Sequence, residues 1–128
     1  MFHVTMDSSK NLEETIKSVT ENLKNEQFGV QWVFNINEKL SAKGFDLDAQ
    51  YRILEVCNPK EAHRVLSQNP LISYFLPCKI VVYQDKEGQV KVGMPKPTAL
   101  ISMVEDNNLK DIAVDIENRL VACIKNSL

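Results

Sequence analysis

The sequence of 128 residues has little glycine, no long apolar run and no excess of basic residues, and each shortage excludes a class of function. The four glycines are scattered singly, so the chain has no glycine-rich loop that could cradle a phosphate. The longest apolar runs, such as KIVVY, are far too short to cross a bilayer as a helix. The net charge is −2 at pH 7, so no basic face is required. We therefore expect neither a membrane nor a nucleic acid as partner, and no motif predicts a cofactor.

Cysteine is also scarce, and its number and context indicate a compartment. The chain has three cysteines, an odd number, and the stretch MFHVTMDSSK lacks the basic and apolar regions of a secretory signal. Disulfide frameworks are typical of secreted domains, whereas cytoplasmic thiols stay reduced. We therefore expect a cytoplasmic protein with free thiols.

The composition is that of an ordinary folded domain. Hydrophobic residues make up 44% of the chain and charged residues 25%, both near the average for globular proteins. Alternating apolar residues predict strands and spacings of three and four predict helices, which gives the order β-α-β-(α)-β-α-β-β-α-α. We therefore predict a single domain over residues 1–128 with an α+β fold. The expected architecture is a two-layer sandwich in which one mostly antiparallel or mixed sheet has helices packed on one face.

Three segments carry the clearest periodic patterns. A helix over residues 12–26 is predicted by an apolar stripe that follows the N-cap Asn11. A strand over residues 28–36 is predicted to place Trp32 in the core, on one apolar face with its period-two neighbours Phe28, Val30, Phe34 and Ile36. The last helix is predicted to open at the cap Asn108. Its buried stripe is expected to contain Leu109, Ile112, Ile116, Leu120, Cys123 and Ile124.

The stretch YRILEVCNPKEAHRVL predicts a strand that runs directly into a helix. The strand covers residues 51–57 and ends at Cys57. Asn58 is the expected N-cap, Pro59 takes the first helical position, and Glu61 can reach back to the cap. The helix is expected to bury Ala62, Val65 and Leu66. Further along, CKIVVYQ and QVKVGM predict a hairpin, with Gly88 in its turn.

The motifs LEVCNPKEAHRVL and YFLPCKIVVYQDKEGQVKV resemble the domain of unknown function family DUF302. The matching features are a strand ending in Cys-Asn-Pro, a helix with Ala62 and Leu66, then Leu-Pro-Cys and a hairpin. The resemblance extends through NLKDIAVDIENRL, so it covers nearly the whole chain. It implies a small α+β domain that pairs as a dimer, and it implies no particular biochemical role. One departure is Lys96, which stands before Pro97 where the family tends to have Asp; a lysine cannot cap the short helix that follows.

Cys57 is the sharpest candidate for chemistry. It lies just before a helix start, where exposed amides and the helix dipole favour a thiolate. The alternative interpretation is a small, buried residue at a strand end. Cys78 follows Pro77, and the loop before it is long enough to bring it back to Cys57; core packing is again the alternative.

Two neighbouring residues complete the candidate set. His63 with Cys57 and Cys78 would give a Cys/Cys/His metal set, but the spacing matches no common zinc template. An exposed helix histidine is the simpler interpretation, so we predict no metal and keep the three residues as weak candidates. Glu55 is expected on the surface, because Leu54 and Val56 can supply the buried side of the strand.

Two functions stay open at this stage, and whether the protein is an enzyme stays undecided. The favoured one is a non-enzymatic dimeric module that binds a small ligand near the two cysteine turns, through Cys57, Asn58 and Cys78. The alternative is a thiol-based redox protein or enzyme in which Cys57 is the nucleophile and Cys78 the resolving partner. The homodimer expectation also rests on apolar residues that lie off the main stripes, namely Val33, Val114 and Val121.

Overall fold

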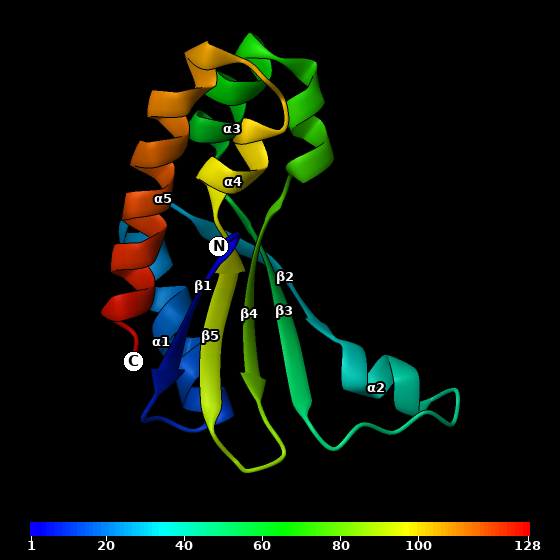
Figure 1. Cartoon of the computed structure of the whole chain (residues 1–128). Coiled ribbons are helices and arrows are strands. Elements are labelled where there is room, and N and C mark those ends of the chain that lie inside the picture. Colours follow the sequence, from blue (N-terminus) through cyan, green and yellow to red (C-terminus); the bar gives the residue numbers. More distant parts are fainter.

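The sheet of this protein is antiparallel throughout and contains five strands in the order β1-β5-β4-β3-β2. The computed structural model describes residues 1–128 (Figure 1). In chain order its elements are β1 (His3–Ser8), α1 (Leu12–Asn25), β2 (Gly29–Asn35), α2 (Ile36–Ser41), β3 (Gln50–Cys57), α3 (Pro59–Gln68), the 3₁₀ helix η1 (Pro70–Phe75), β4 (Cys78–Gln84), β5 (Val90–Pro95), α4 (Pro97–Ser102), the 3₁₀ helix η2 (Asn107–Leu109) and α5 (Lys110–Lys125). The predicted α+β fold class is confirmed.

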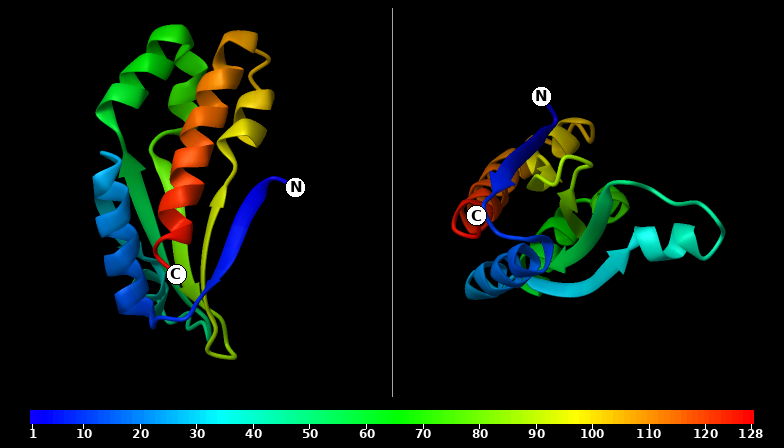
Figure 2. Two further views of the ribbon diagram at one scale, coloured as in Figure 1. Left: turned by 90° about the vertical axis from the view of Figure 1, so that its left-hand side faces the viewer. Right: turned by 90° about the horizontal axis from the view of Figure 1, so that it is seen from below.

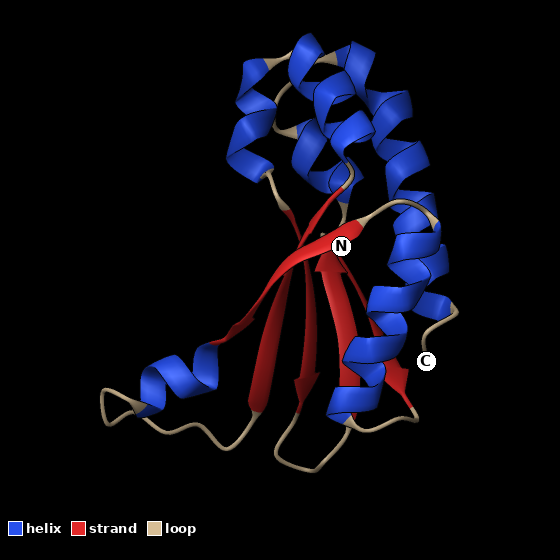
Figure 3. Ribbon diagram, turned by 180° about the vertical axis from the view of Figure 1, so that it is seen from behind, coloured by secondary structure: helices blue, strands red, loops and turns tan.

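The helices divide into three groups around this sheet. α1 and α5 cover one face, and the opposite face carries no helix (Figure 2). α3, η1, α4 and the first half of α5 gather beyond the end of the sheet at which β3 ends and β4 begins (Figure 3). α2 projects away from the rest of the molecule (Figure 1). The two cysteine turns therefore lie where the sheet meets the helical group.

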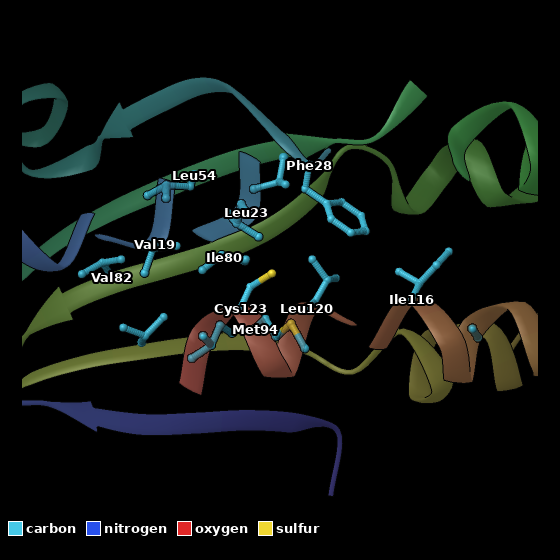
Figure 4. Packing of buried hydrophobic residues seen from close by; sticks show 14 of the residues in the cluster. Val19, Leu23, Phe28, Leu54, Ile80, Val82, Met94, Ile116, Leu120 and Cys123 are labelled. Carbon is cyan, nitrogen blue, oxygen red and sulfur yellow. The ribbon is translucent and has the colours of Figure 1, made fainter. Parts of the chain in front are cut away.

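The core lies between the sheet and the two helices that cover it (Figure 4). Alternate strand residues face it and are fully buried, as the period of two requires. On the strands these residues include Leu54, Val56, Ile80, Val82 and Val92. On the helices they include Val19, Leu23, Leu120 and Ile124.

α1 begins as its sequence predicts. The side-chain oxygen of Asn11 accepts a hydrogen bond from the Glu14 amide at 2.8 Å, which satisfies one of the free amides of the first turn. The predicted stripe is Leu12, Ile16, Val19 and Leu23; Leu12, Val19 and Leu23 are buried, and Ile16 is half-buried against the core.

The face predicted for β2 is wrong beyond Val30, because the strand contains a bulge. Val30 and Trp32 pair with consecutive residues of β3, which leaves Gln31 as an extra residue. An extra residue shifts the alternation of side chains by one position. Phe28 is therefore buried in the core, whereas Trp32 is 58% exposed and stacks with Phe34 on the uncovered face at a centroid distance of 5.1 Å.

α3 buries a different side from the one predicted. Val65 is buried as expected, but Leu66 is 40% exposed and Ala62 is half-buried. Glu61 takes the place of an apolar residue on the buried side. The pattern of apolar residues alone does not predict this, because the helix faces an arginine of α5.

The approach to α5 also differs from the prediction. The side-chain oxygen of Asp106, not of Asn108, accepts an amide hydrogen bond and starts the turn η2, and α5 follows from Lys110. The predicted stripe of α5 is confirmed, because all of its members are buried. The hairpin glycine is confirmed too, since Gly88 has a φ of 90°. No helix in the protein combines the length and the apolar character needed to span a membrane.

Candidate functional site

The Cys-Asn-Pro turn lies where β3 meets α3, as predicted. β3 ends at Cys57, and the side-chain oxygen of Asn58 accepts a hydrogen bond from the Glu61 amide at 3.2 Å, with Pro59 in the first turn. The Asn58 side-chain amide donates to the Glu26 carbonyl at 3.3 Å. Asn58 is 6% exposed, so both polar groups of a buried side chain bind within the protein and fix the turn.

Cys78 begins β4 and lies beside the same turn. Val56 is directly opposite Cys78 in the β3–β4 ladder, and Cys57 and Cys78 both line a small cavity at this junction. Burial is the main cause that raises the pKa of the Cys78 thiol to about 11, and negative charge on nearby Cys57 and Glu55 acts in the same direction. At neutral pH Cys78 is therefore a protonated thiol, which behaves as a small apolar group and a weak donor.

The two thiols are close in the fold but lie on different faces of the sheet. Consecutive strand residues alternate between faces, so Cys57 lies on the face opposite to Val56. Val56 is fully buried in the core, and its partner Cys78 packs against that core. A disulfide requires Cβ vectors that approach one another, so the ladder does not prearrange this pair for one. All three cysteines are free.

Glu55 lies on the predicted side of β3 but is less exposed than predicted. Leu54 and Val56 supply the buried side, as expected. The Glu55 side chain is only 15% exposed, because its Oε1 pairs with the ammonium of Lys79 directly opposite on β4, at 2.5 Å. Its Oε2 is buried and has no hydrogen-bond partner. Glu55 is therefore a paired carboxylate with one oxygen left over, on the uncovered face of the sheet.

His63 does not join the two cysteines. It is exposed on α3, and no group of three His, Cys, Asp or Glu side chains lies close enough to hold a metal ion. The Cys57, His63 and Cys78 set is thus not assembled as a ligand set.

An ion-pair cluster around the buried carboxylate of Glu61 lies beside the cysteine turns and was not predicted from the sequence. The Glu61 carboxylate contacts Arg119 at 3.1 Å and Arg64 at 3.4 Å. The Arg119 guanidinium also lies 5.1 Å from the centre of the Phe28 ring and donates to the Glu26 carbonyl at 3.3 Å. Glu61 and Arg119 are 58 positions apart, so no local spacing could reveal their contact. This cluster ties α3 to α5 and to the end of α1.

A larger cavity of about 390 Å³ opens where the sheet meets the helical group. Thirteen of its 17 lining residues are hydrophobic, and Lys79 is the only charged one. Its walls come from η1, α4, α5 and the adjoining ends of β4 and β5, with Phe75, Met94 and Ala113 among the lining residues. Cys78 lines this cavity as well as the small one. The only sequence signal is the apolar stretch PLISYFLP, which has no regular period; the other walls come from distant segments.

Comparison with known proteins gives two findings that agree. The family model described as "Domain of unknown function DUF302" matches residues 4–127. The chain is also similar to a solved structure, described as the crystal structure of an uncharacterized conserved protein DUF302 from Bacillus stearothermophilus. That match has 55% sequence identity and a TM-score of 0.97, and it covers 100% of this chain and 99% of that chain. No curated protein matches this chain.

Proposed function

This chain belongs to the DUF302 family of domains of unknown function, and we propose that it is a non-enzymatic module that binds a small apolar molecule in the cavity beside Cys78. The observation that carries the proposal is the cavity itself. Its volume of about 390 Å³ lies within the usual range of small-molecule sites, and most of its lining is hydrophobic. A well-formed and mostly apolar cavity with a few polar groups is the usual form of a small-molecule site.

The lining indicates the chemistry of the ligand. Lys79 is the only charged lining residue, and its ammonium pairs with Glu55 outside the cavity wall. Cys78 faces the ligand as a neutral thiol, since its pKa is raised to about 11. A buried charge without a partner is costly, so the part of the ligand inside the cavity is uncharged. Any polar group of the ligand points to the mouth, where Tyr74 is 81% exposed.

Two observations favour this function over thiol chemistry. A resolving cysteine must form a thiolate and reach its partner, whereas Cys78 has a raised pKa and lies on the opposite face of the sheet from Cys57. Two carboxylates lie near this pair, and both are engaged: Glu55 pairs with Lys79, and Glu61 pairs with Arg119 and Arg64. Neither is therefore free to act as a base.

The module is further proposed to be a homodimer. The resemblance to the family implies this, and exposed apolar side chains such as Val33 and Phe45 support it. The dimer and the ligand site are separate parts of the proposal, because neither of these two residues lines the cavity.

A fluorescence titration tests the ligand site. The probe is N-phenyl-1-naphthylamine, a neutral aromatic molecule that becomes fluorescent in apolar surroundings. The expected result is a saturable increase with one site per chain. Ala113→Leu adds side-chain volume to the cavity wall. Because the probe and the larger side chain then compete for space, the affinity for the probe should fall by about tenfold.

The matched control is Ala122→Leu, which makes the same change at an exposed position of the same helix. It should leave the titration unchanged, and circular dichroism should show both variants folded. Leu100→Trp fills the cavity from α4 and repeats the test from another wall. A titration that does not saturate, or equal probe affinity in all variants, would show that the cavity is not the ligand site.

A further inference from the structure

We propose that two copies of this chain form a two-fold dimer in which the arm of each copy packs on the uncovered sheet face of the other. The arm is residues 36–49, which comprise α2 and the loop to β3. The uncovered face is the side of β2, β3 and β4 opposite to α1 and α5. This inference rests on the dimer part of the proposed function and assigns its surface; it does not depend on the cavity.

The arm and the strand before it contain no fully buried residue within one chain. Between Phe28 and Leu54 no residue is buried, and α2 has no buried side chain. Two large apolar residues of the arm lie in solvent, since Phe45 is 67% and Leu47 is 45% exposed. Large apolar side chains that are exposed together on a projecting segment are typical of a protein–protein contact.

The arm is nevertheless a fixed structure. The Asn35 side chain accepts the Glu38 amide at 3.0 Å and starts α2, and the Phe45 amide donates to the Leu40 carbonyl after Gly44, whose φ is 85°. Such caps at both ends hold a short helix in place.

One side chain ties the base of the arm to the sheet. The side-chain amide of Asn37 donates to the Ala49 carbonyl at 2.8 Å, and its oxygen accepts the Tyr51 amide at 2.6 Å. A rigid arm loses little conformational entropy when it binds, which favours association.

The uncovered face offers an apolar and charge-neutral surface to such an arm. Trp32 stacks with Phe34, and Tyr51 stacks with Tyr83 at a centroid distance of 5.6 Å, so four aromatic rings lie on strands of this face. The lysine of the face, Lys79, is already paired with Glu55, and Lys91 on the adjoining strand β5 is paired with Asp7. Burial of this face in a dimer therefore leaves few charged groups without a partner.

A second copy is the occupant because the arm and the face belong to one chain but do not meet in it. α2 projects beyond the sheet, and its main tertiary contact is with β3 (Figure 2). In a two-fold dimer every chain supplies one arm and one face, so the apolar contact forms twice. A stable interface uses about 20–30 residues from each partner, and the unburied segment 29–53 is of that length. The arm holds two lysines and three acidic residues, so like charges oppose the pairing only weakly.

Light scattering and the fluorescence of Trp32, the only tryptophan, test the inference together. At micromolar concentration the wild type should have twice the chain mass of 14.6 kDa. Dilution should shift the Trp32 emission to longer wavelength as the ring leaves the interface. The double variant Phe45→Ser with Leu47→Ser should be a monomer with red-shifted emission, and it should remain folded because both positions are exposed in the single chain.

Val114→Ser, which removes an exposed apolar side chain on α5, is the matched control and should stay dimeric. A wild type with single-chain mass at every concentration would overturn both the interface and the dimer. A dimer that survives the arm variant would overturn the interface alone and leave the dimer standing. The probe titration in the arm variant should match the wild type, since the ligand cavity lies at the other end of the sheet.

Discussion

The Glu117 carboxylate on α5 accepts two hydrogen bonds from Thr98 on α4, one from its amide at 3.1 Å and one from its hydroxyl at 2.7 Å. Lys96, the residue at the cap position of α4, makes no side-chain capping bond. The cap that the local sequence lacks is therefore supplied from another helix. This contact also joins two walls of the ligand cavity, since α4 and α5 both line it.

Removal of this contact should destabilise the protein. We expect Glu117→Ala to lower the free energy of unfolding by about 1–2 kcal/mol, because a cap and a charged hydrogen bond are lost together. Asn118→Ala, at an exposed neighbouring position, should change it by less than about 0.5 kcal/mol. Urea melts of the three proteins measure the difference. Equal midpoints would show that the Glu117–Thr98 contact contributes nothing.

The segments that were predicted correctly are those whose structure depends on neighbours in sequence. The start of α1 at Asn11, the turn at Asn58 and the hairpin at Gly88 each require only a few adjacent residues, and each is confirmed. The α5 stripe is also correct, because its apolar residues recur at helical spacing along the whole helix.

The errors come from residues whose neighbours are far away in the sequence. No residue near Gln31 indicates that β2 bulges there. Strict alternation of side chains therefore predicts the wrong face of the sheet for Trp32. Glu61 is buried because Arg119 of α5 meets it, and no local pattern contains that arginine. The cavity has the same origin: it is bounded by η1, α4, α5 and two strand ends, and it exists only once these are packed.

Asn58 should be a stability residue. Asn58→Ala should cost about 1 kcal/mol through the lost cap of α3, and the lost hydrogen bond to the Glu26 carbonyl should add to this. Asn58→Asp keeps the acceptor for the Glu61 amide but loses the donor, so its cost should be smaller. Urea melts again provide the measurement, with the exposed Asn107→Ala as control. A melt of Asn58→Ala that matches the wild type would contradict the turn geometry described above.

Cys57 should be the most reactive of the three thiols. Cys78 has a pKa raised to about 11, chiefly by burial, and burial likewise raises the pKa of Cys123, which is only 3% exposed. Iodoacetamide at neutral pH, followed by peptide mass spectrometry, should therefore label Cys57 first. In urea, where the chain is unfolded, the three cysteines should be alkylated at similar rates. Faster labelling of Cys78 or Cys123 in the folded protein would leave Cys57 as a packing residue.

The stability of the protein should fall in alkali because of Cys78. The thiol has an ordinary pKa of 9.0 when exposed and about 11 in the folded chain. Between these values the unfolded chain releases the Cys78 proton while the folded chain keeps it, so rising pH favours the unfolded state. The resulting loss should approach about 2–3 kcal/mol by the upper end of that range.

Urea melts of wild type and Cys78→Ala, from just below pH 9.0 to about pH 11, isolate this effect. Cys123 also has a raised pKa and acts in the same direction, but it is present in both proteins and cancels in the comparison. The wild type should therefore lose stability more steeply than the variant, and the two curves should differ most near pH 11. Parallel curves would show that Cys78 ionises as easily in the fold as in the unfolded chain. The thiol would then be available as a nucleophile at the cavity wall, and the case for a purely non-covalent ligand site would lose its main chemical support.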